Sequence, residues 1–302
     1  MELENASILL ERRLVPVVAG PEIGVFLGVS SKLVSRASAC PERYYHEFKI
    51  LKKNGSFRTI SAPRVYLKTI QRYLLDCILS RVKMADCVIG FVRGRRVRDG
   101  ASRHVGAKFL WNIDLKDFFP SIKSIYVKNI YLNLGYSEQA AGFLTKLCCL
   151  HGVLPQGAPT SPMLANLSFA EADLEIMKLC QRQMVAYTRY ADDLSFSCSN
   201  PIEPGFQGAI LAVIGRHDFR VNAEKTRLVG PLCRREVTGL TINEKVSVPR
   251  PIRRNIRAMV HNYCRSPDSV KENLDQIRGR IAYIANHHPD EAQRLLRDLE
   301  GV

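Results

Sequence analysis

The sequence predicts an α+β fold in which an antiparallel sheet packs against helices. Residues 187–197 form two runs of aromatic and β-branched residues that meet at a turn, which is typical of a β-hairpin. The apolar run 109–114 indicates a buried strand, and residues 44–60 predict another hairpin. Segments 66–81 and 161–184 instead repeat apolar residues at the spacing of amphipathic helices. With 302 residues, 46% of them hydrophobic, the chain can bury a substantial core.

The N-terminal part predicts helices followed by the first hairpin. Residues 3–36 indicate helical segments that carry no chemistry of their own. Residues 44–51 and 57–60 predict strands joined at Lys53-Asn54-Gly55, because Asn-Gly favours a tight turn. The helix predicted over 66–81 has one apolar face and serves packing.

A loop at residues 91–100 is rich in arginine and glycine. Such a loop could be a solvated charge run, but arginines beside glycines also form a mobile basic surface that can follow a phosphate backbone. We expect contact with a nucleic-acid strand from this loop. Its arginines are Arg93, Arg95, Arg96 and Arg98.

Carboxylates end two of the predicted strands. Asp192 and Asp193 occupy the turn within 187–197, although like charges repel and Asp is a poor strand former. Asp114 ends the apolar strand 109–114, where it can face that turn. Three carboxylates from two such places suit two Mg²⁺ ions, which stabilise the attacking and leaving oxygens of a phosphoryl transfer. The spacing alone predicts phosphoryl transfer without specifying the reaction.

The remaining segments predict helices around this sheet and a basic tail. After the helices at 125–134 and 138–150, one long helix is expected from Ser161-Pro162 to about Met184, with Leu174 on its inner face. Residues 237–248 predict a hairpin around Asn243-Glu244, followed by a helical tail. The tail carries many cations, with Tyr263 and Tyr283 among them, and aromatic side chains can stack on bases while cations bind phosphates.

Composition excludes some classes of protein. The chain has 44 Lys and Arg against 29 Asp and Glu, a net charge of +15, which favours a polyanionic partner. Its nine cysteines include no C-x-x-C pair, so they predict neither a zinc ribbon nor a redox motif, and we expect reduced thiols in a cytoplasm. No signal peptide or membrane span is predicted.

Three motifs in this order resemble the palm of reverse transcriptases. A lone Tyr-x-Asp-Asp would be a weak signal, but the ordered set is specific. A fourth element, soon after the palm motifs, resembles the bacterial retron reverse transcriptases. The motifs are Asp114 with Phe118-Phe119, then Leu154-Pro155-Gln156-Gly157-Ala158-Pro159-Thr160-Ser161-Pro162, then Tyr190-Ala191-Asp192-Asp193 with Lys225 following, and finally Val237-Thr238-Gly239-Leu240.

This resemblance covers roughly residues 40–290 and implies a right-hand polymerase with fingers, palm and thumb, its antiparallel palm sheet packed on helices. The implied domains are an N-terminal helical segment (1–40), fingers with the basic loop (41–108), a catalytic palm (109–235) and a basic, helical thumb (236–302).

The resemblance also implies roles for individual residues. Asp114, Asp192 and Asp193 would hold the two Mg²⁺ ions, and Lys225 would protonate the leaving pyrophosphate. Phe119 would exclude a ribose 2′-hydroxyl, while Gly157 would let the backbone approach a ligand closely. Arg58 suits a triphosphate contact, but an exposed cross-strand charge explains it equally well. The expected nucleotide contacts are Arg58, Asp117, Phe119 and Gln156, and the further expected RNA contacts are Val237, Thr238, Gly239, Arg253, Arg254 and Arg257.

The resemblance implies a retron enzyme that copies a cognate noncoding RNA into DNA from dNTPs. The DNA would start at a guanosine 2′-hydroxyl, and the branched RNA–DNA product would serve antiphage defence with a separate effector protein. Ala101 and His104 match a retron Asn-Ala-x-x-His element in which Gly100 replaces Asn, and His104 is expected to be structural. The alternatives are a group II intron-type or diversity-generating reverse transcriptase, or an inactive RNA-binding scaffold.

Overall fold

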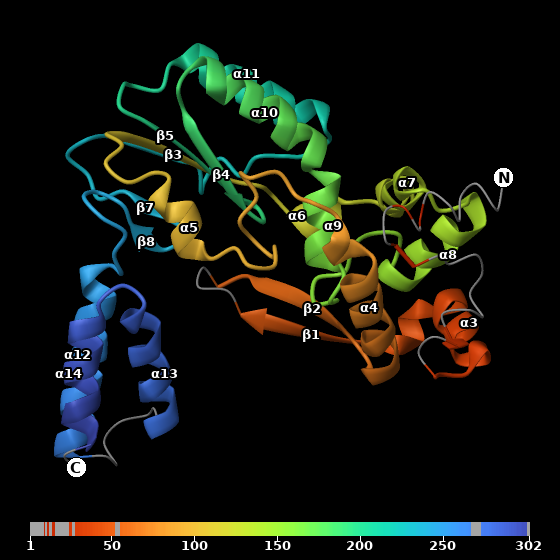
Figure 1. Ribbon diagram of the computed structural model, residues 1–302, viewed down its shortest axis with the longest axis horizontal. Helices are drawn as coiled ribbons and strands as arrows, with labels where there is room; N and C mark the ends of the chain where they lie inside the picture. The colour runs from red at the N-terminus through yellow and green to blue at the C-terminus, as the bar shows by residue number, and fades with distance from the viewer. Residues whose placement is uncertain are drawn as a thin grey trace.

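The computed structural model describes residues 9, 11, 14, 15, 24, 25, 28–51, 55–266 and 273–300 (Figure 1). Most of the predicted N-terminal helical segment and the predicted Lys53-Asn54 turn lie outside these residues. The elements are α3 (Ser31–Ala39), η1 (Pro41–Tyr44), β1 (Tyr45–Leu51), β2 (Phe57–Pro63), α4 (Val65–Cys77), η2 (Leu79–Arg81), α5 (Val97–Ser102), β3 (Phe109–Asp114), α6 (Phe118–Ser121), α7 (Ser124–Leu134), α8 (Glu138–Cys148), α9 (Ser161–Ser168), α10 (Ala170–Arg182), β4 (Ala186–Tyr190), β5 (Asp193–Cys198), α11 (Pro204–Arg216), β6 (Arg227–Val229), β7 (Glu236–Val237), β8 (Leu240–Thr241), α12 (Arg250–Arg265), α13 (Leu274–Ala285) and α14 (Pro289–Glu300).

The central sheet has the strand order β4-β5-β3-β6, and every neighbouring pair is antiparallel. The predicted strand at 109–114 is confirmed as β3, whose residues Leu110, Trp111 and Ile113 are buried. Asp114 pairs with Asp193, which also pairs with Tyr190 across the next strand. This register brings the end of β3 beside the turn between β4 and β5.

Helices cover the sheet and enclose the larger hydrophobic core. Figure 1 shows α10 and α11 side by side, and α10 also packs against β4. In the core, Tyr187 stacks on Phe196 at a ring separation of 4.8 Å, and Trp111 packs on Phe196 in a tilted arrangement at 5.2 Å. Apolar residues spaced for one face of each helix meet apolar strand residues here, so the core fixes the position of the sheet.

The predicted long helix from Ser161 is interrupted. It divides at Phe169 into α9 and α10, and Ser168 bonds back to the Leu164 carbonyl, an interaction that often bends helices. The break shifts the phase of α10, so the predicted inward direction of Leu174 is wrong. Leu174 is 53% exposed, whereas its neighbour Asp173 is fully buried.

The N-terminal hairpin is confirmed as β1 paired antiparallel with β2. Both strands are largely exposed apart from their ends next to α4. The C-terminal hairpin differs from the prediction, because β7 and β8 pair around Thr238-Gly239. Both residues have positive φ, which a tight two-residue hairpin turn requires and glycine readily adopts. The pairing expected across Asn243-Glu244 is present only as a bridge between Thr241 and Ser247.

Helices α12, α13 and α14 pack on one another and form a second hydrophobic core with β7 and β8. Its buried residues include Ile256, Ile277, Ile281 and Leu295, which lie on the inner faces of the three helices, and Leu110 of β3 joins this core to the sheet. Figure 1 shows the three helices as a separate bundle beside the rest of the molecule.

Two predictions from composition can be compared with the structure. Every cysteine is a free thiol, as expected for a reducing compartment. Within the part of the chain that the structure describes, no helix combines the length and apolar character needed to cross a bilayer.

Candidate active site

Asp114 stands at the end of β3 and is held by the segment that follows α11. Its backbone carbonyl accepts a hydrogen bond from the Asn222 N–H at 2.8 Å, and its carboxylate accepts one from the Asn222 side chain at 3.2 Å. Lys225 Nζ donates to both carboxylate oxygens, at 2.9 Å and 3.0 Å. The sequence interpretation did not identify Asn222 as a partner of Asp114.

The turn between β4 and β5 presents the other two carboxylates. Ala191 is buried and has a φ of 55°, in the left-handed region that non-glycine residues rarely adopt. The Leu115 N–H donates to the Asp192 carbonyl at 2.9 Å, which ties the turn to the residue after Asp114. Asp192 is half-buried, and Asp193 is exposed. The predicted meeting of Asp114 with this turn is therefore seen.

The three carboxylates perturb one another electrostatically. Burial, and then the charge of Asp114, raise the pKa of Asp192. Although Asp193 is exposed as a residue, the protein around its carboxyl group removes part of the surrounding water. This desolvation, followed by repulsion from Asp192 and Asp114, raises the pKa of Asp193 to about 6. The hydrogen bonds to Asp114 raise the pKa of Lys225, so its ammonium stays charged and offsets part of this repulsion.

This donor set matches the chemistry of Mg²⁺, which prefers oxygen ligands and relieves repulsion among carboxylates. Among the described residues, no three acidic, histidine or cysteine side chains are already gathered into a metal-binding cluster. Lys225 instead occupies both oxygens of Asp114. A metal ion at Asp114 would therefore share this carboxylate with Lys225, and Asp114, Asp192 and Asp193 are the residues that would hold it.

Phe119 and Asp117 lie just beyond β3. Phe118 is buried, with its ring 5.6 Å from that of Phe219, whereas Phe119 is half-buried and meets Phe118 edge-on at 5.7 Å. Asp117 is exposed, with a φ of 50°, and precedes α6. The segment thus directs the ring of Phe118 into the core and leaves the ring of Phe119 partly exposed.

The loop at Gln156-Gly157 packs on the N-terminal hairpin. The Gln156 carbonyl accepts from the Ser61 N–H at 2.9 Å. A Cβ at Gly157 would lie 3.0 Å from both Ile60 Cγ2 and the Ser61 carbonyl oxygen. The close approach that the structure shows at Gly157 is made to β2. Gln156 itself is half-buried.

Arg58 is exposed on β2 yet lies near the turn between β4 and β5 that carries Asp192 and Asp193, called the catalytic turn below. Burial raises the pKa of Asp192, and the charge of Arg58 acts in the opposite direction. Arg58 is thus within electrostatic reach of the carboxylates, as a triphosphate contact would need to be.

The arginines of the basic loop differ in their surroundings. Arg95 donates to the carbonyls of Met84, Ala85 and Val88, so it anchors the loop internally. Arg98 donates to the Asn286 carbonyl at 3.0 Å, which joins α5 to the C-terminal helices. Arg93 and Arg96 are exposed. The expected mobile loop is therefore pinned at Arg95, and part of it forms the short helix α5.

The RNA contacts predicted in the C-terminal region differ in how exposed their side chains are and in whether they are paired inside the protein. Val237 is only 1% exposed and packs in the second core, so its side chain does not face a partner. Arg253 Nε lies 2.7 Å from Glu291, and Arg257 lies 3.5 Å from the same residue. Arg254 is exposed, as is the neighbouring Arg250. Thr238 and Gly239 form the tight turn described above.

Gly100 and His104 are both buried in contacts with neighbouring elements. A Cβ at Gly100 would lie 2.9 Å from Ile89 Cγ1, so the packing of α5 leaves no room for the asparagine expected there. His104 is buried between Thr188 Oγ1 and Ser197 Oγ, each 2.7 Å from a ring nitrogen. Burial, with a contribution from Arg103, lowers its pKa to about 4. His104 is thus a neutral structural residue.

A buried ion pair behind the catalytic turn was missed by the sequence interpretation. Arg189 and Asp173 are both fully buried, with Arg189 Nη2 2.5 Å from Asp173 Oδ2. Burial alone would lower the pKa of Arg189, but the charge and hydrogen bonds of Asp173 raise it above its usual value. The available signal was an arginine within an otherwise uncharged strand, together with an aspartate one position from the predicted inner face of the helix.

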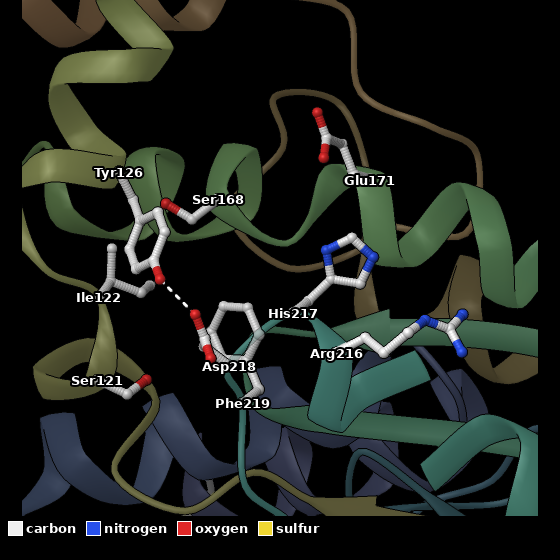
Figure 2. A pocket seen from close by; sticks show the side chains of 9 residues that line it. All are labelled: Ser121, Ile122, Tyr126, Ser168, Glu171, Arg216, His217, Asp218 and Phe219. Carbon is white, nitrogen blue, oxygen red and sulfur yellow. Dashed lines mark hydrogen bonds between the residues drawn. The ribbon is translucent and has the colours of Figure 1, made fainter. Parts of the chain in front are cut away.

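A small pocket lies behind the Phe119 segment (Figure 2). Figure 2 shows the Tyr126 hydroxyl directed at the Asp218 carboxylate, with which it forms a hydrogen bond. Phe219 of the pocket packs on Phe118. The pocket therefore borders the core beneath Phe119 and contains none of the predicted site residues. It is lined by Ser121, Ile122, Tyr126, Ser168, Glu171, Arg216, His217, Asp218 and Phe219.

Known proteins share this architecture. The telomerases of Candida albicans and Candida tropicalis, solved with the TWJ fragment of telomeric RNA, match with TM-scores of 0.50 and 0.52. Sequence identity is 10% and 11%, so the likeness concerns the fold. The matches cover 84% and 90% of this chain, which spans only 56% and 59% of those chains.

Sequence comparison gives the family. A family model described as reverse transcriptase (RNA-dependent DNA polymerase) matches residues 50–242. The retron Mx65 reverse transcriptase of Myxococcus xanthus is 34% identical over 294 residues, covering 91% of this chain and 69% of that protein. The retron Ec86 reverse transcriptase of Escherichia coli is 34% identical over 257 residues, covering 83% and 79%. The chain therefore belongs to the reverse transcriptases, RNA-dependent DNA polymerases with a right-hand fold of fingers, palm and thumb, and within them to the retron enzymes.

Proposed function

We propose that this protein copies a cognate structured noncoding RNA into single-stranded DNA. Synthesis starts from the 2′-hydroxyl of a guanosine in that RNA and leaves a branched RNA–DNA hybrid. The observation that carries the proposal is the meeting of Asp114 with the Asp192-Asp193 turn at one end of the palm sheet. The 34% identity to two retron enzymes supports the choice of this type over an intron-type or diversity-generating enzyme.

Each site residue has a role in the proposed reaction. Two Mg²⁺ ions held by Asp114, Asp192 and Asp193 would activate the primer hydroxyl and neutralise charge on the dNTP triphosphate. Arg58 binds the triphosphate from the fingers, and Lys225, once it leaves Asp114, supplies a proton to the pyrophosphate. Asp117 and Gln156 contact the nucleotide, while Phe119 excludes a ribose 2′-hydroxyl by its bulk.

The RNA would lie along the basic surfaces of the fingers and thumb. Arg93 and Arg96 on the fingers, with Arg254 on α12, are exposed cations that can bind phosphates. Thr238 and Gly239 offer a turn at the start of the thumb. The net charge of +15 supports a polyanionic partner of this kind.

The proposal extends to the cell by resemblance to the retron family. The enzyme would act in the cytoplasm, and its RNA–DNA product would assemble with a separate effector protein in antiphage defence. The free thiols agree with a reducing compartment.

The nucleic acid that copurifies with the protein from its native host tests the retron assignment. It is run on a denaturing gel before and after treatment with RNase and with debranching enzyme. We expect one discrete DNA species whose mobility shifts on debranching. Heterogeneous DNA would indicate a general reverse transcriptase, and RNA alone would indicate an inactive scaffold.

Asp192→Asn tests the catalytic assignment. The substitution keeps the shape of the side chain but removes a charge that binds metal, so DNA synthesis should fall by about a thousandfold or more. RNA binding, measured by filter retention, should stay within about twofold because the phosphate contacts lie elsewhere. Synthesis that survives this change would show that Asp192 is not a metal ligand.

A further inference from the structure

Arg189 lies in β4, one residue before Tyr190, and uses every N–H group of its guanidinium. A guanidinium has five donors. Nε bonds to Asp173 Oδ1 at 2.9 Å, and Nη2 bonds to Asp173 Oδ2 at 2.5 Å and more weakly to the Asn166 carbonyl at 3.5 Å. Nη1 bonds to Asn166 Oδ1 at 2.9 Å and to the carbonyl of Ala191, within the catalytic turn, at 3.2 Å.

The hydrogen-bond partners of Arg189 connect strand β4 to helices α9 and α10 and to the loop before the basic arginines. Asp173 on α10 also accepts from the Tyr187 hydroxyl at 2.7 Å. Asn166 on α9 donates through Nδ2 to the carbonyl of Gly90 at 2.8 Å. One buried network therefore joins two palm helices, strand β4 and the loop that leads to the basic arginines.

That loop also touches the catalytic turn directly. The Arg189 N–H donates to the Cys87 carbonyl at 2.7 Å, and the Arg189 carbonyl accepts from the Ile89 N–H at 2.8 Å. A Cβ at Gly90 would lie 2.9 Å from the backbone nitrogen of Ala191 and 3.2 Å from Tyr190 Cα. The turn is thus confined between the Arg189 side chain and the backbone of the loop.

We propose that Arg189 is a positioning residue that, together with the loop 87–91, holds the catalytic turn in its left-handed conformation and so directs Asp192 toward Asp114. Left-handed backbone at a non-glycine residue is unfavourable and persists only where the surroundings impose it. The bond from Arg189 to the Ala191 carbonyl supplies that constraint at the strained residue itself. A buried ion pair adds little stability over apolar packing, so stability alone does not account for this arrangement.

The inference rests on the proposed function, because Asp192 is taken as a metal ligand. Arg189→Lys keeps the positive charge but lacks the planar fork that reaches Asp173, Asn166 and Ala191 together. Gly90→Ala is a second variant, which leaves the ion pair intact and crowds the turn from the other side. Gln71→Met is the matched control, because Gln71 is also fully buried and hydrogen-bonded, to Tyr45 and Leu147, at a distance from the turn in the fold.

The measurements are copying of poly(rA) primed with oligo(dT) and the metal dependence of thermal melting. We expect Arg189→Lys to raise the Mg²⁺ concentration for half-maximal rate by about tenfold and to lower kcat by a similar factor. The reason is that Asp192 would no longer be directed toward Asp114, and a small displacement of a catalytic group lowers the rate steeply. KM for dTTP should stay within about twofold, since Arg189 does not bind nucleotide. The rise in melting temperature on adding Mn²⁺ should shrink in the variant, because metal stabilises only the form that binds it.

Gln71→Met should melt earlier but keep the metal requirement of the wild type. A folded Arg189→Lys protein with the wild-type metal requirement, or an equal change in Gln71→Met, would overturn the proposal. If Arg189→Lys does not fold, Gly90→Ala decides by the same two measurements. A wild-type protein that copies no template would contradict the proposed function, whereas the Mn²⁺-dependent melting would still report on the turn.

Discussion

Phe119 is half-buried, and the edge-on contact with Phe118, itself buried against Phe219, limits how far its ring can move. A ring supported in this way can exclude a bulky group, because retreat would disturb the core. The neighbouring Asp117 is exposed and lacks such support. At the scale of single residues, then, we expect the proposed selectivity for the sugar of the nucleotide to depend on packing behind Phe119.

Phe119→Ala should let the enzyme incorporate ribonucleotides. Without the ring nothing blocks the 2′-hydroxyl, and the preference for dNTPs over rNTPs should fall on the order of a hundredfold. The measurement is kcat/KM for dTTP and UTP on the same template, with Phe119→Tyr as the control that keeps the bulk. An unchanged ratio in Phe119→Ala would remove Phe119 from the site.

Strands β4 and β5 are joined by a buried histidine that acts as a structural link. His104, just after α5, bonds to Thr188 on β4 and to Ser197 on β5. Water cannot reach this buried site to solvate a charged imidazolium, and burial therefore lowers the pKa of His104 to about 4. The strands that carry Asp192 and Asp193 are thus held together by a group that must stay neutral.

His104 should make the fold sensitive to acid. An unfolded histidine has a pKa near 6.5, so between pH 6.5 and 4 the unfolded chain binds more protons than the folded one and stability falls as the pH falls. From pH 6.5 to 5 the loss due to His104 is about 2 kcal/mol. Urea unfolding at both pH values should show this loss in the wild type and a smaller one in His104→Gln. Equal losses would mean that the imidazole is already charged in the folded protein.

The sequence predicted elements best where local periodicity decides them. Helix α7 ends at Gly135, and the N-terminal hairpin pairs, as expected from an apolar face, a glycine stop and alternating strands. Prediction from the sequence failed where contacts with residues on other elements decide the direction of a side chain. The inward direction of Asp173 on α10 depends on Arg189, which lies on strand β4. The meeting of Asp114 with the Asp192-Asp193 turn could be predicted because these carboxylates form a motif. The network of Arg189 behind them could not be predicted because its members are scattered along the sequence.

At the scale of the whole molecule, the buried apolar residues form two hydrophobic cores, and Leu110 of β3 belongs to the core of the C-terminal helices. The thumb helices thus have an interior of their own. A groove on α12 is lined by Arg250, Arg253, Arg254 and Arg257. Arg253 and Arg257 are paired with Glu291, whereas Arg250 and Arg254 are exposed. The net charge of +15 predicted a polyanionic partner, but only the structure separates exposed cations from those paired inside the protein.

Exposed and paired arginines of α12 should differ in their effect on RNA binding. Arg250 and Arg254 are exposed, so Arg250→Gln with Arg254→Gln should weaken binding and reduce the slope of log K against log salt by about 1 for each phosphate that the protein no longer binds. Arg253→Gln is the control, because Arg253 is paired with Glu291. Binding is measured by fluorescence anisotropy on a structured RNA from about 50 to about 300 mM KCl, salt concentrations over which such electrostatic binding weakens. Equal slopes in all three proteins would place the RNA elsewhere.

The pair formed by Lys225 and Asp114 means that the protein carries a cation of its own at the place where a diffusible one would bind. Folding and metal loading can then be separate events, since the buried carboxylate is neutralised from the moment the chain folds. If Asp114, Asp192 and Asp193 hold a divalent ion, that ion would take over part of this neutralisation. The ammonium of Lys225 would then be available to a negatively charged triphosphate, so the group that balances the charge of the site without metal would also serve the site with metal.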